Sequence, residues 1–131
     1  MSLRIVQDEQ KILDAQAAIG VGKWVDVTDF SNIVLGIDTT DNANFTLYVV
    51  GAISESTPDP TQPQSPTNRW YTIQAIDNDA NIAYDGSQGI SASGTDIHKL
   101  FRINVDGLKW ITVYVGNYTA GKITAYIKAF D

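Results

Sequence analysis

The sequence contains no cysteine and only one histidine among its 131 residues. The absence of cysteine excludes disulfides and thiolate metal sites, and a single histidine cannot supply the ligand set of a zinc site. No apolar run approaches the ~20 residues of a membrane span, so no membrane-spanning helix is predicted. The first ten residues, MSLRIVQDEQ, lack an apolar signal core, which predicts no Sec-type export.

Glutamate is also scarce. Only Glu9 and Glu55 are glutamates among the 15 acidic residues, and the others are aspartates. Aspartate favours turns and glutamate favours helices, so this imbalance argues against a helical protein. The net charge is −6 and the nine basic residues are scattered. A nucleic-acid-binding protein normally has a basic face, so no nucleic-acid partner is predicted.

Alternation of apolar and polar residues dominates the sequence and predicts short β-strands. Together with the turn signals between them, about eight to ten such strands predict a single antiparallel β-sandwich, all-β and jelly-roll-like. The predicted strands are residues 3–7, 12–19, 24–30, 32–38, 44–53, 69–77, 97–105, 109–116 and 122–130.

The length suits one domain spanning residues 1–131. Residues 1–19 alternate only weakly, and we expect an N-terminal arm or edge strands there. Residues 54–68 contain all four prolines. Because proline lacks the N–H that a strand ladder needs, this segment is predicted to be a long surface loop, extended and solvated. The residues from 78 to 96 are rich in turn formers.

The sequence contains an internal repeat at an offset of 78 residues. The segment VDVTDFSNIVLGIDTTDNANFTLYVVGA aligns without a gap with VDGLKWITVYVGNYTAGKITAYIKAF and the two residues before it. In both copies the alternation is interrupted at one place, where Phe30 or Leu108 is expected to lie under a corner of the chain. Each copy is therefore predicted to form strand, corner, strand, turn, strand, and two such units can face each other.

The second copy places aromatic residues at outward positions. Large exposed aromatic patches usually mark contact surfaces. Trp110, Tyr114, Tyr126 and Phe130 are therefore predicted to be interface residues. Three explanations stay open: cover by the N-terminal strands or the long loop of the same chain, a protein–protein interface, and a platform for stacking sugars. Other outward positions of the two copies include Asn32, Val34, Gly36, Val50, Thr112 and Lys128.

Motifs for catalysis and cofactor binding are weak. His98 has no Gly-x-Ser-x-Gly elbow to accompany it, and GVGK at residues 20–23 lacks the spacing of a phosphate-binding loop. Calcium could use the oxygens of Asp77, Asp79, Asn81 and Asp85, but the loop lacks glycine at its sixth position and an acid at its twelfth. We interpret this segment as a polar turn, and predict no enzyme activity, catalytic residue, metal or cofactor.

Four segments resemble a known family: GKWVDVTDFSNIVLGID, SPTNRWYTIQAID, DGSQGISASGTDIHKLFRINVDGLKWITVYV and GKITAYIKAF. Across residues 20–130 the chain resembles β-sandwich structural proteins of tailed bacteriophages, namely capsid decoration (cement) proteins and related tail or fibre modules. Parts of these motifs are common to β-sandwiches in general, and no functional residue can be carried over from the family.

The resemblance implies a virion protein without catalysis, made in the host cytoplasm. Its implied role is capsid decoration, in which it stabilises the shell by bridging capsomers. The implied partners are the major capsid protein or other virion proteins, and a homo-oligomer, with a trimer favoured. An alternative is a carbohydrate- or receptor-binding module of a phage tail or fibre.

Overall fold

The computed structural model describes residues 6–131, and these residues form ten β-strands and no helix. All pairings between the strands are antiparallel. The predicted all-β, antiparallel fold is therefore confirmed, and no described helix could cross a membrane. The strands are β1 (Gln10–Gln16), β2 (Gly20–Val21), β3 (Val25–Asp26), β4 (Asn32–Ala52), β5 (Tyr71–Thr72), β6 (Ala75–Asp77), β7 (Ala83–Tyr84), β8 (Ile90–Gly94), β9 (His98–Asn104) and β10 (Trp110–Phe130).

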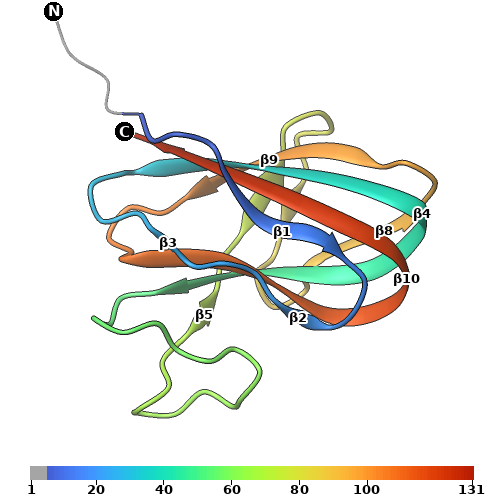
Figure 1. Ribbon diagram of the computed structural model, residues 1–131. Coiled ribbons are helices and arrows are strands. Elements are labelled where there is room, and N and C mark those ends of the chain that lie inside the picture. The colour runs from blue at the N-terminus through green and yellow to red at the C-terminus, as the bar shows by residue number, and fades with distance from the viewer. Residues whose placement is uncertain (1–5) are drawn as a thin grey trace, which may run out of the picture.

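The ten strands belong to one hydrogen-bonded sheet that folds back on itself (Figure 1). Its main strand order is β1-β10-β4-β9-β6-β7, with β2 and β3 also paired to β10, and β5 and β8 also paired to β4. The strand predicted at residues 3–7 falls mostly on residues 1–5, which lie outside the described residues.

The two longest strands, β4 and β10, organise the sheet. Each has 21 residues, and they pair from one end, Trp110 with Ala52, to the other, Phe130 with Asn32. Figure 1 shows both strands bending back at the right of the molecule. We call residues 32–40 of β4 and 122–130 of β10 the upper arms. Residues 43–52 of β4 and 110–116 of β10 are the lower arms.

The bend corrects a prediction, because turns were expected where each long strand in fact continues. At the bend of β4, Asp41 and Asn42 have φ values of 64° and 53°. Short polar side chains tolerate this left-handed conformation, so the strand can bend without ending. On β10 the pairing register shifts three times between Val115 and Lys122. Such bulges increase bending and twist while pairing resumes on the far side.

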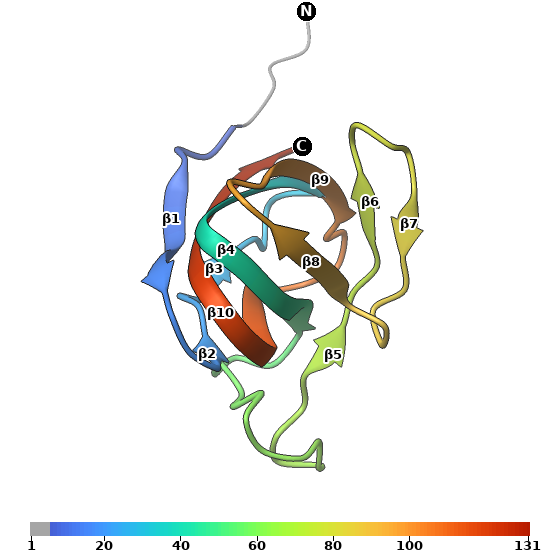
Figure 2. The same cartoon turned by 90° about the vertical axis from the view of Figure 1, so that its right-hand side faces the viewer.

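The predicted repeat is confirmed by the strand bounds. Adding 78 to the bounds of β4 gives the bounds of β10, and adding 78 to the outer bounds of β2 and β3 gives those of β9. Figure 2 shows β4 and β10 side by side in the middle of the fold, with β1 to β3 on one side and β8 and β9 on the other. The segment between β4 and β8, residues 53–89, carries β5 to β7, and we call it the insertion.

The two predicted corners are also confirmed, because they make the same hydrogen bonds. Phe30 N–H donates to the carbonyl of Val27 at 3.0 Å, and Leu108 N–H donates to that of Val105 at 2.9 Å. Val27 N–H in turn donates to the Lys109 carbonyl at 2.8 Å, and Val105 N–H to the Ser31 carbonyl at 2.9 Å. Phe30 and Leu108 both pack against the core, as expected.

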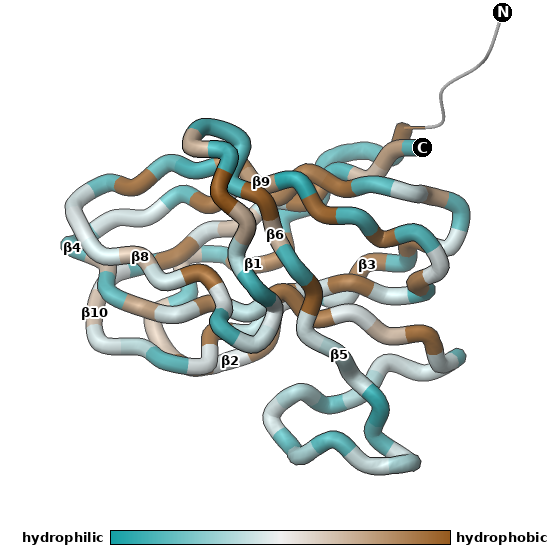
Figure 3. Tube along the Cα trace, turned by 180° about the vertical axis from the view of Figure 1, so that it is seen from behind, coloured by the Kyte–Doolittle hydropathy of each residue, from teal (hydrophilic) through white to brown (hydrophobic). Residues whose placement is uncertain are grey.

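The core lies between the upper and lower arms. It consists of the inward residues of the two copies, including Ile33, Leu35, Leu47, Ile111, Val113 and Ile127. Figure 3 shows the same alternation of hydrophobic and paler residues along the strands, while the projecting loop is mostly hydrophilic.

We predict that Gly121 is essential at the bend of β10. Its φ is +95°, and an added Cβ would lie 2.4 Å from the Cα of Ala43 at the bend of β4. Gly121→Ala should therefore combine backbone strain with a clash against backbone atoms. Gly107→Ala is a matched control, because Gly107 has φ +87° but no heavy atom within 4 Å of its Cβ position.

Urea unfolding should show a loss of about 1–2 kcal/mol for Gly107→Ala from the left-handed conformation alone. For Gly121→Ala the loss should be larger by a further ~1–3 kcal/mol from overpacking. Equal losses for the two variants would contradict the close approach of the two bends.

Candidate functional site

The outer face of the lower arms is covered by the chain itself. Val50 and Thr112 lie on this outward face and do not belong to the core cluster, yet both are 0% exposed. The Thr112 hydroxyl donates to the carbonyl of Lys23 at 2.8 Å, and Trp110 Nε1 donates to the carbonyl of Ser54 at 3.1 Å. Figure 1 shows the proline-rich loop below these arms.

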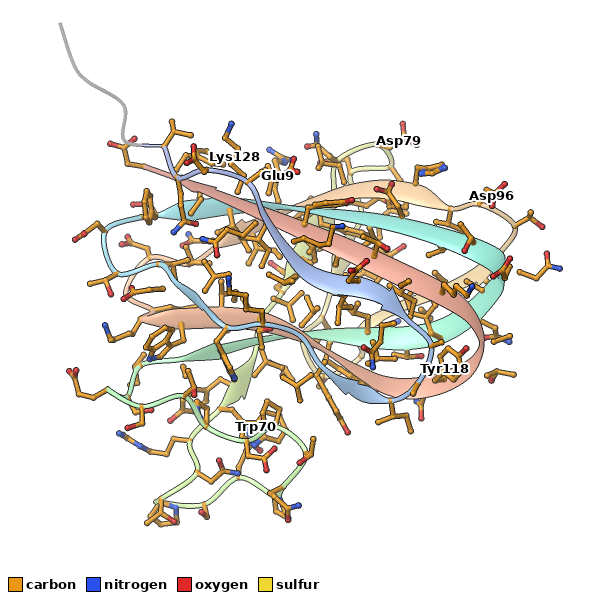
Figure 4. The ribbon with its side chains drawn as sticks, viewed as in Figure 1. Glu9, Trp70, Asp79, Asp96, Tyr118 and Lys128 are labelled. Carbon is orange, nitrogen blue, oxygen red and sulfur yellow. The ribbon has the colours of Figure 1, made fainter. Side chains whose placement is uncertain are left out.

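The loop is better organised than its composition indicates. The Asn68 side chain accepts from Asp59 N–H at 2.7 Å and donates to the carbonyls of Asp59 and Pro63 at 2.9 and 3.1 Å. Trp70 Nε1 donates to the Gln62 carbonyl at 3.0 Å, and Figure 4 shows Trp70 within the loop. Most loop residues are exposed, yet Pro60 is buried. Side-chain amides therefore fold a segment that was expected to be merely extended and solvated.

The outer face of the upper arms, by contrast, has no such cover from residues 6–131. Side chains at paired positions of antiparallel strands lie on the same face, so the pairing registers give its rows directly. One row is Lys128, Val34, Arg102 and Ile76, from β10, β4, β9 and β6. We call this surface the open face and define it by Asn32, Val34, Gly36, Leu100, Arg102, Asn104, Tyr126, Lys128 and Phe130, with Val6 and Ile76 at its margins.

The open face combines apolar groups with long cations. Leu100 is 43% exposed and Val6 is 47% exposed. Val6, Val34, Lys128 and Phe130 line a shallow hollow. Neither Lys128 nor Arg102 forms an ion pair with any residue in the described range 6–131. Figure 4 places Lys128 and Glu9 on this upper side of the molecule.

The repeat allows the two outer faces to be compared position by position. At an offset of 78, Val34 of the open face corresponds to Thr112, and Lys128 corresponds to Val50. The first residue of each pair is accessible or half-buried, while the second is fully buried. Two equivalent surfaces of the same fold therefore differ in whether the chain covers them.

The structure divides the four predicted interface aromatics between these two faces. Trp110 and Tyr114 lie on the lower arms, where Tyr114 stacks on Tyr48 with the ring centroids 6.4 Å apart. Tyr126 and Phe130 lie on the open face, where Lys11 Nζ is 5.9 Å from the centre of the Tyr126 ring. All four are half-buried in the single chain. They do not form one patch, because the bend separates the two pairs.

The candidate catalytic and calcium residues have ordinary structural roles. His98 Nδ1 lies 2.7 Å from Asp38 Oδ1 on the surface, and within residues 6–131 no serine hydroxyl contacts this imidazole. Asp85 accepts from the Ser87 N–H and hydroxyl, both at 2.9 Å. These bonds stabilise the anion and lower the pKa of Asp85, as in a polar turn.

Asp77 is the one fully buried acid among the described residues, with 1% exposure. Its Oδ1 accepts from the N–H groups of Asp79 and Ala80 at 2.9 and 3.2 Å, and its Oδ2 lies 3.2 Å from Lys99 Nζ. Burial alone would raise the pKa of Asp77, but the bonds from Ala80, Asp79 and Lys99 outweigh it, so the pKa is lowered. The hydrogen bond and charge of Asp77 raise the pKa of Lys99.

The fold resembles solved structures of two phage-derived proteins. The SPBc2 prophage-derived protein YomS has a TM-score of 0.70 and 10% identity, with all of this chain and 97% of that chain covered. The PBSX exported protein XepA has a TM-score of 0.73 and 12% identity, and this chain spans 39% of its length. At these identities the likeness concerns the fold. No protein-family model and no curated protein matches the sequence.

Several residues of the open face were not selected from the sequence as site residues. Leu100 and Arg102 alternate with the buried Phe101 and Ile103, and such a pattern is typical of any half-buried strand. Their importance depends on which other strands lie beside β9 and on the lack of a covering segment within residues 6–131. Only the strand order supplies that information.

We predict that Asp77→Asn removes a pH-dependent contribution to folding. Because the pKa of Asp77 is lower in the folded chain, its contribution is present above the unfolded value near 4 and is lost as pH falls through the folded value. At pH 7 the variant should lose about 1–2 kcal/mol, since the Lys99 ammonium is partly solvated and its attraction is screened.

Urea denaturation at pH 7 and pH 3 tests this prediction, with Asp79→Asn, an exposed neighbour, as the control. The difference between wild type and Asp77→Asn should shrink at pH 3, while Asp79→Asn should stay close to wild type. A difference that is the same at both pH values would show that the ionised Asp77 does not stabilise the fold.

Proposed function

We propose that this chain is a non-enzymatic structural protein of a phage particle, and that it works by docking its open face onto another particle protein. The observation that carries the proposal is the unequal cover of two equivalent surfaces. The insertion and residues 22–24 cover the lower arms, while the open face keeps Leu100 and Val6 exposed. Burying one large apolar side chain contributes roughly 1.5–3 kcal/mol, so a partner would gain by covering this face.

The charges of the open face indicate the chemistry of that partner. Lys128 and Arg102 flank Val34 in one row, and in a chain of net charge −6 they are cations without ion-pair partners in the described part of the chain. A complementary surface would present apolar groups flanked by carboxylates. Charges at such margins steer association and select the partner.

The specific role that we propose is capsid decoration. The partner would be the major capsid protein, and the chain would bridge neighbouring capsomers in the virion, as the family resemblance implies. A homo-oligomer, with a trimer favoured, belongs to the same proposal. The phage-derived structural neighbours support a phage context for this fold.

The alternative is a glycan- or receptor-binding module of a phage tail or fibre. On the open face, the aromatic rings that a sugar could stack against are those of Tyr126 and Phe130. Both rings are half-buried, which leaves less area for stacking than a platform of exposed rings would offer. Glycan binding by the isolated protein would favour this alternative.

We predict that reversing a charge on the open face weakens binding to particles. Lys128→Glu and Arg102→Glu should each reduce affinity for purified phage particles lacking this protein by tenfold or more, which corresponds to ~1.4 kcal/mol or more. Neither should change the melting temperature by more than about 2 °C, because both side chains are exposed and surface changes are nearly neutral.

Lys23→Glu is the matched control, since Lys23 is also exposed but lies beside the covered face. Co-sedimentation of each variant with particles gives the affinities. If Lys23→Glu weakens binding as much as Lys128→Glu, net charge rather than the open face governs association. If the wild-type chain does not bind any particle, the proposed function is wrong.

A further inference from the structure

Strand β8 is an edge of the sheet that lacks the usual protection against pairing with another chain. Among the described residues it pairs with β4 alone, in an unbroken register from Leu47–Ile90 to Ala43–Gly94. Its sequence, ISASG, contains no charge and no proline. Native edge strands are normally blocked by charges, proline, bulges or short length.

The other edges have such features. Strand β1 carries Lys11 and Asp14 and has two register shifts. Strands β2, β3, β5 and β7 have only two residues each. Strand β8 therefore differs from the other edges in offering five regular residues with small side chains.

A groove lies beside β8, between it and strands β6, β7 and β9. Its walls include Ala92 and Ser93 of β8, Tyr84 of β7, Lys99 and Phe101 of β9, and Ile97. Figure 2 shows β8 and the β6–β7 hairpin on the same side of the molecule. A free edge beside such a groove can accept an added strand from another chain. The main-chain hydrogen bonds to the edge then supply affinity, and every second side chain of the added strand enters the groove.

Three exposed carboxylates follow or precede the segments that line the groove. Asp79 and Asp85 follow β6 and β7, and Asp96 precedes Ile97, and all three are exposed. Figure 4 shows Asp79 at the turn after β6, at the top of the molecule, and Asp96 at the turn between β8 and β9, at its right end. The cation among the lining residues, Lys99, is already paired with Asp77 at 3.2 Å. An added strand that is basic and apolar would therefore suit the site.

We propose that residues 1–5 of a second copy of this chain add as a strand to β8. Their sequence is MSLRI, in which Leu3 and Ile5 alternate with Arg4 and there is no acid. The apolar side chains of this segment could enter the groove, and its positive charge would be attracted to the neighbouring carboxylates. Its length also matches the five residues of β8.

The donor must be another copy because of where Val6 lies. Val6 is paired with Phe130, which pairs with Asn32 of β4, whereas β8 begins its pairing eleven residues further along β4, at Ala43. A strand formed by residues 1–5 of the same chain would have to end next to Val6, which lies at the end of the upper arms remote from the bend and is not among the residues lining the groove. Figure 1 places the C-terminal end of β10, where Val6 is bound, at the left of the molecule and β8 in its right half.

Donor and acceptor are therefore different surfaces of each copy. Such a heterologous contact joins copies head to tail, and it closes into a ring if the rotation between neighbours permits. This inference concerns the isolated protein and does not depend on the proposed role in a phage particle.

Two complementary variants test the proposal. Deleting residues 2–5 removes the donor strand and keeps the groove, while Ser93→Lys places a charge on the edge and keeps the donor. We expect wild type to form oligomers at about 100 μM by size-exclusion chromatography with light scattering. Each variant alone should be monomeric, and an equimolar mixture should form a one-to-one heterodimer, because the arm of Ser93→Lys fits the free groove of the deletion variant.

Circular dichroism tests whether each variant is folded. If the deletion variant is unfolded, the double substitution Leu3→Asp and Arg4→Glu replaces it. Ala17→Lys, an equal change of charge at an exposed position outside the groove, should leave the oligomer intact. The proposal is overturned if wild type is monomeric, if either defective variant keeps the wild-type mass, or if the mixture stays monomeric.

Discussion

The pairing of β4 with β10 is the constraint on which the rest of the structure depends. Two 21-residue strands stay hydrogen-bonded while both bend, so one ladder supplies both the upper and the lower wall around the core. Strands β1, β2 and β3 pair with β10, and strands β5, β8 and β9 pair with β4. Strand β6 joins the sheet through β9, and β7 joins it through β6. The equivalent hydrogen bonds at the two corners follow from this arrangement, because each copy places its corner against the end of the other copy's long strand.

The insertion between the copies breaks this symmetry, because it lies against the lower arms and not against the upper arms. It organises its own backbone through Asn68 and Trp70 and is joined to Trp110 of the lower arms. The equivalent upper arms receive no such cover in the described chain, and their outward residues include Val34, Arg102 and Lys128. The repeat alone would leave the two outer faces equivalent, and the insertion is what distinguishes them.

Much of the fold could be predicted from the sequence because its signal is local. Alternation gave the strands around Ile33 and Ile111, and the interrupted alternation gave the corners at Phe30 and Leu108. The turns expected within β4 and β10 were wrong, because Asp41 and Asn42 adopt left-handed conformations inside a continuing strand. Strand β8 was missed because small residues such as Ser91 and Ser93 give no apolar alternation. The open face depends on residues of β4, β9 and β10 that are far apart in the sequence, so no local pattern identifies it.

The most direct measurement of the central claim uses the absence of cysteine. Leu100→Cys places a single thiol on the open face, and Ile53→Cys places one at an exposed position beside the lower arms. Maleimide labelling of each variant, free and bound to particles, reports which face is covered. The account predicts that binding slows labelling at position 100 at least tenfold and leaves position 53 nearly unchanged. Protection at position 53 with unchanged labelling at position 100 would contradict it.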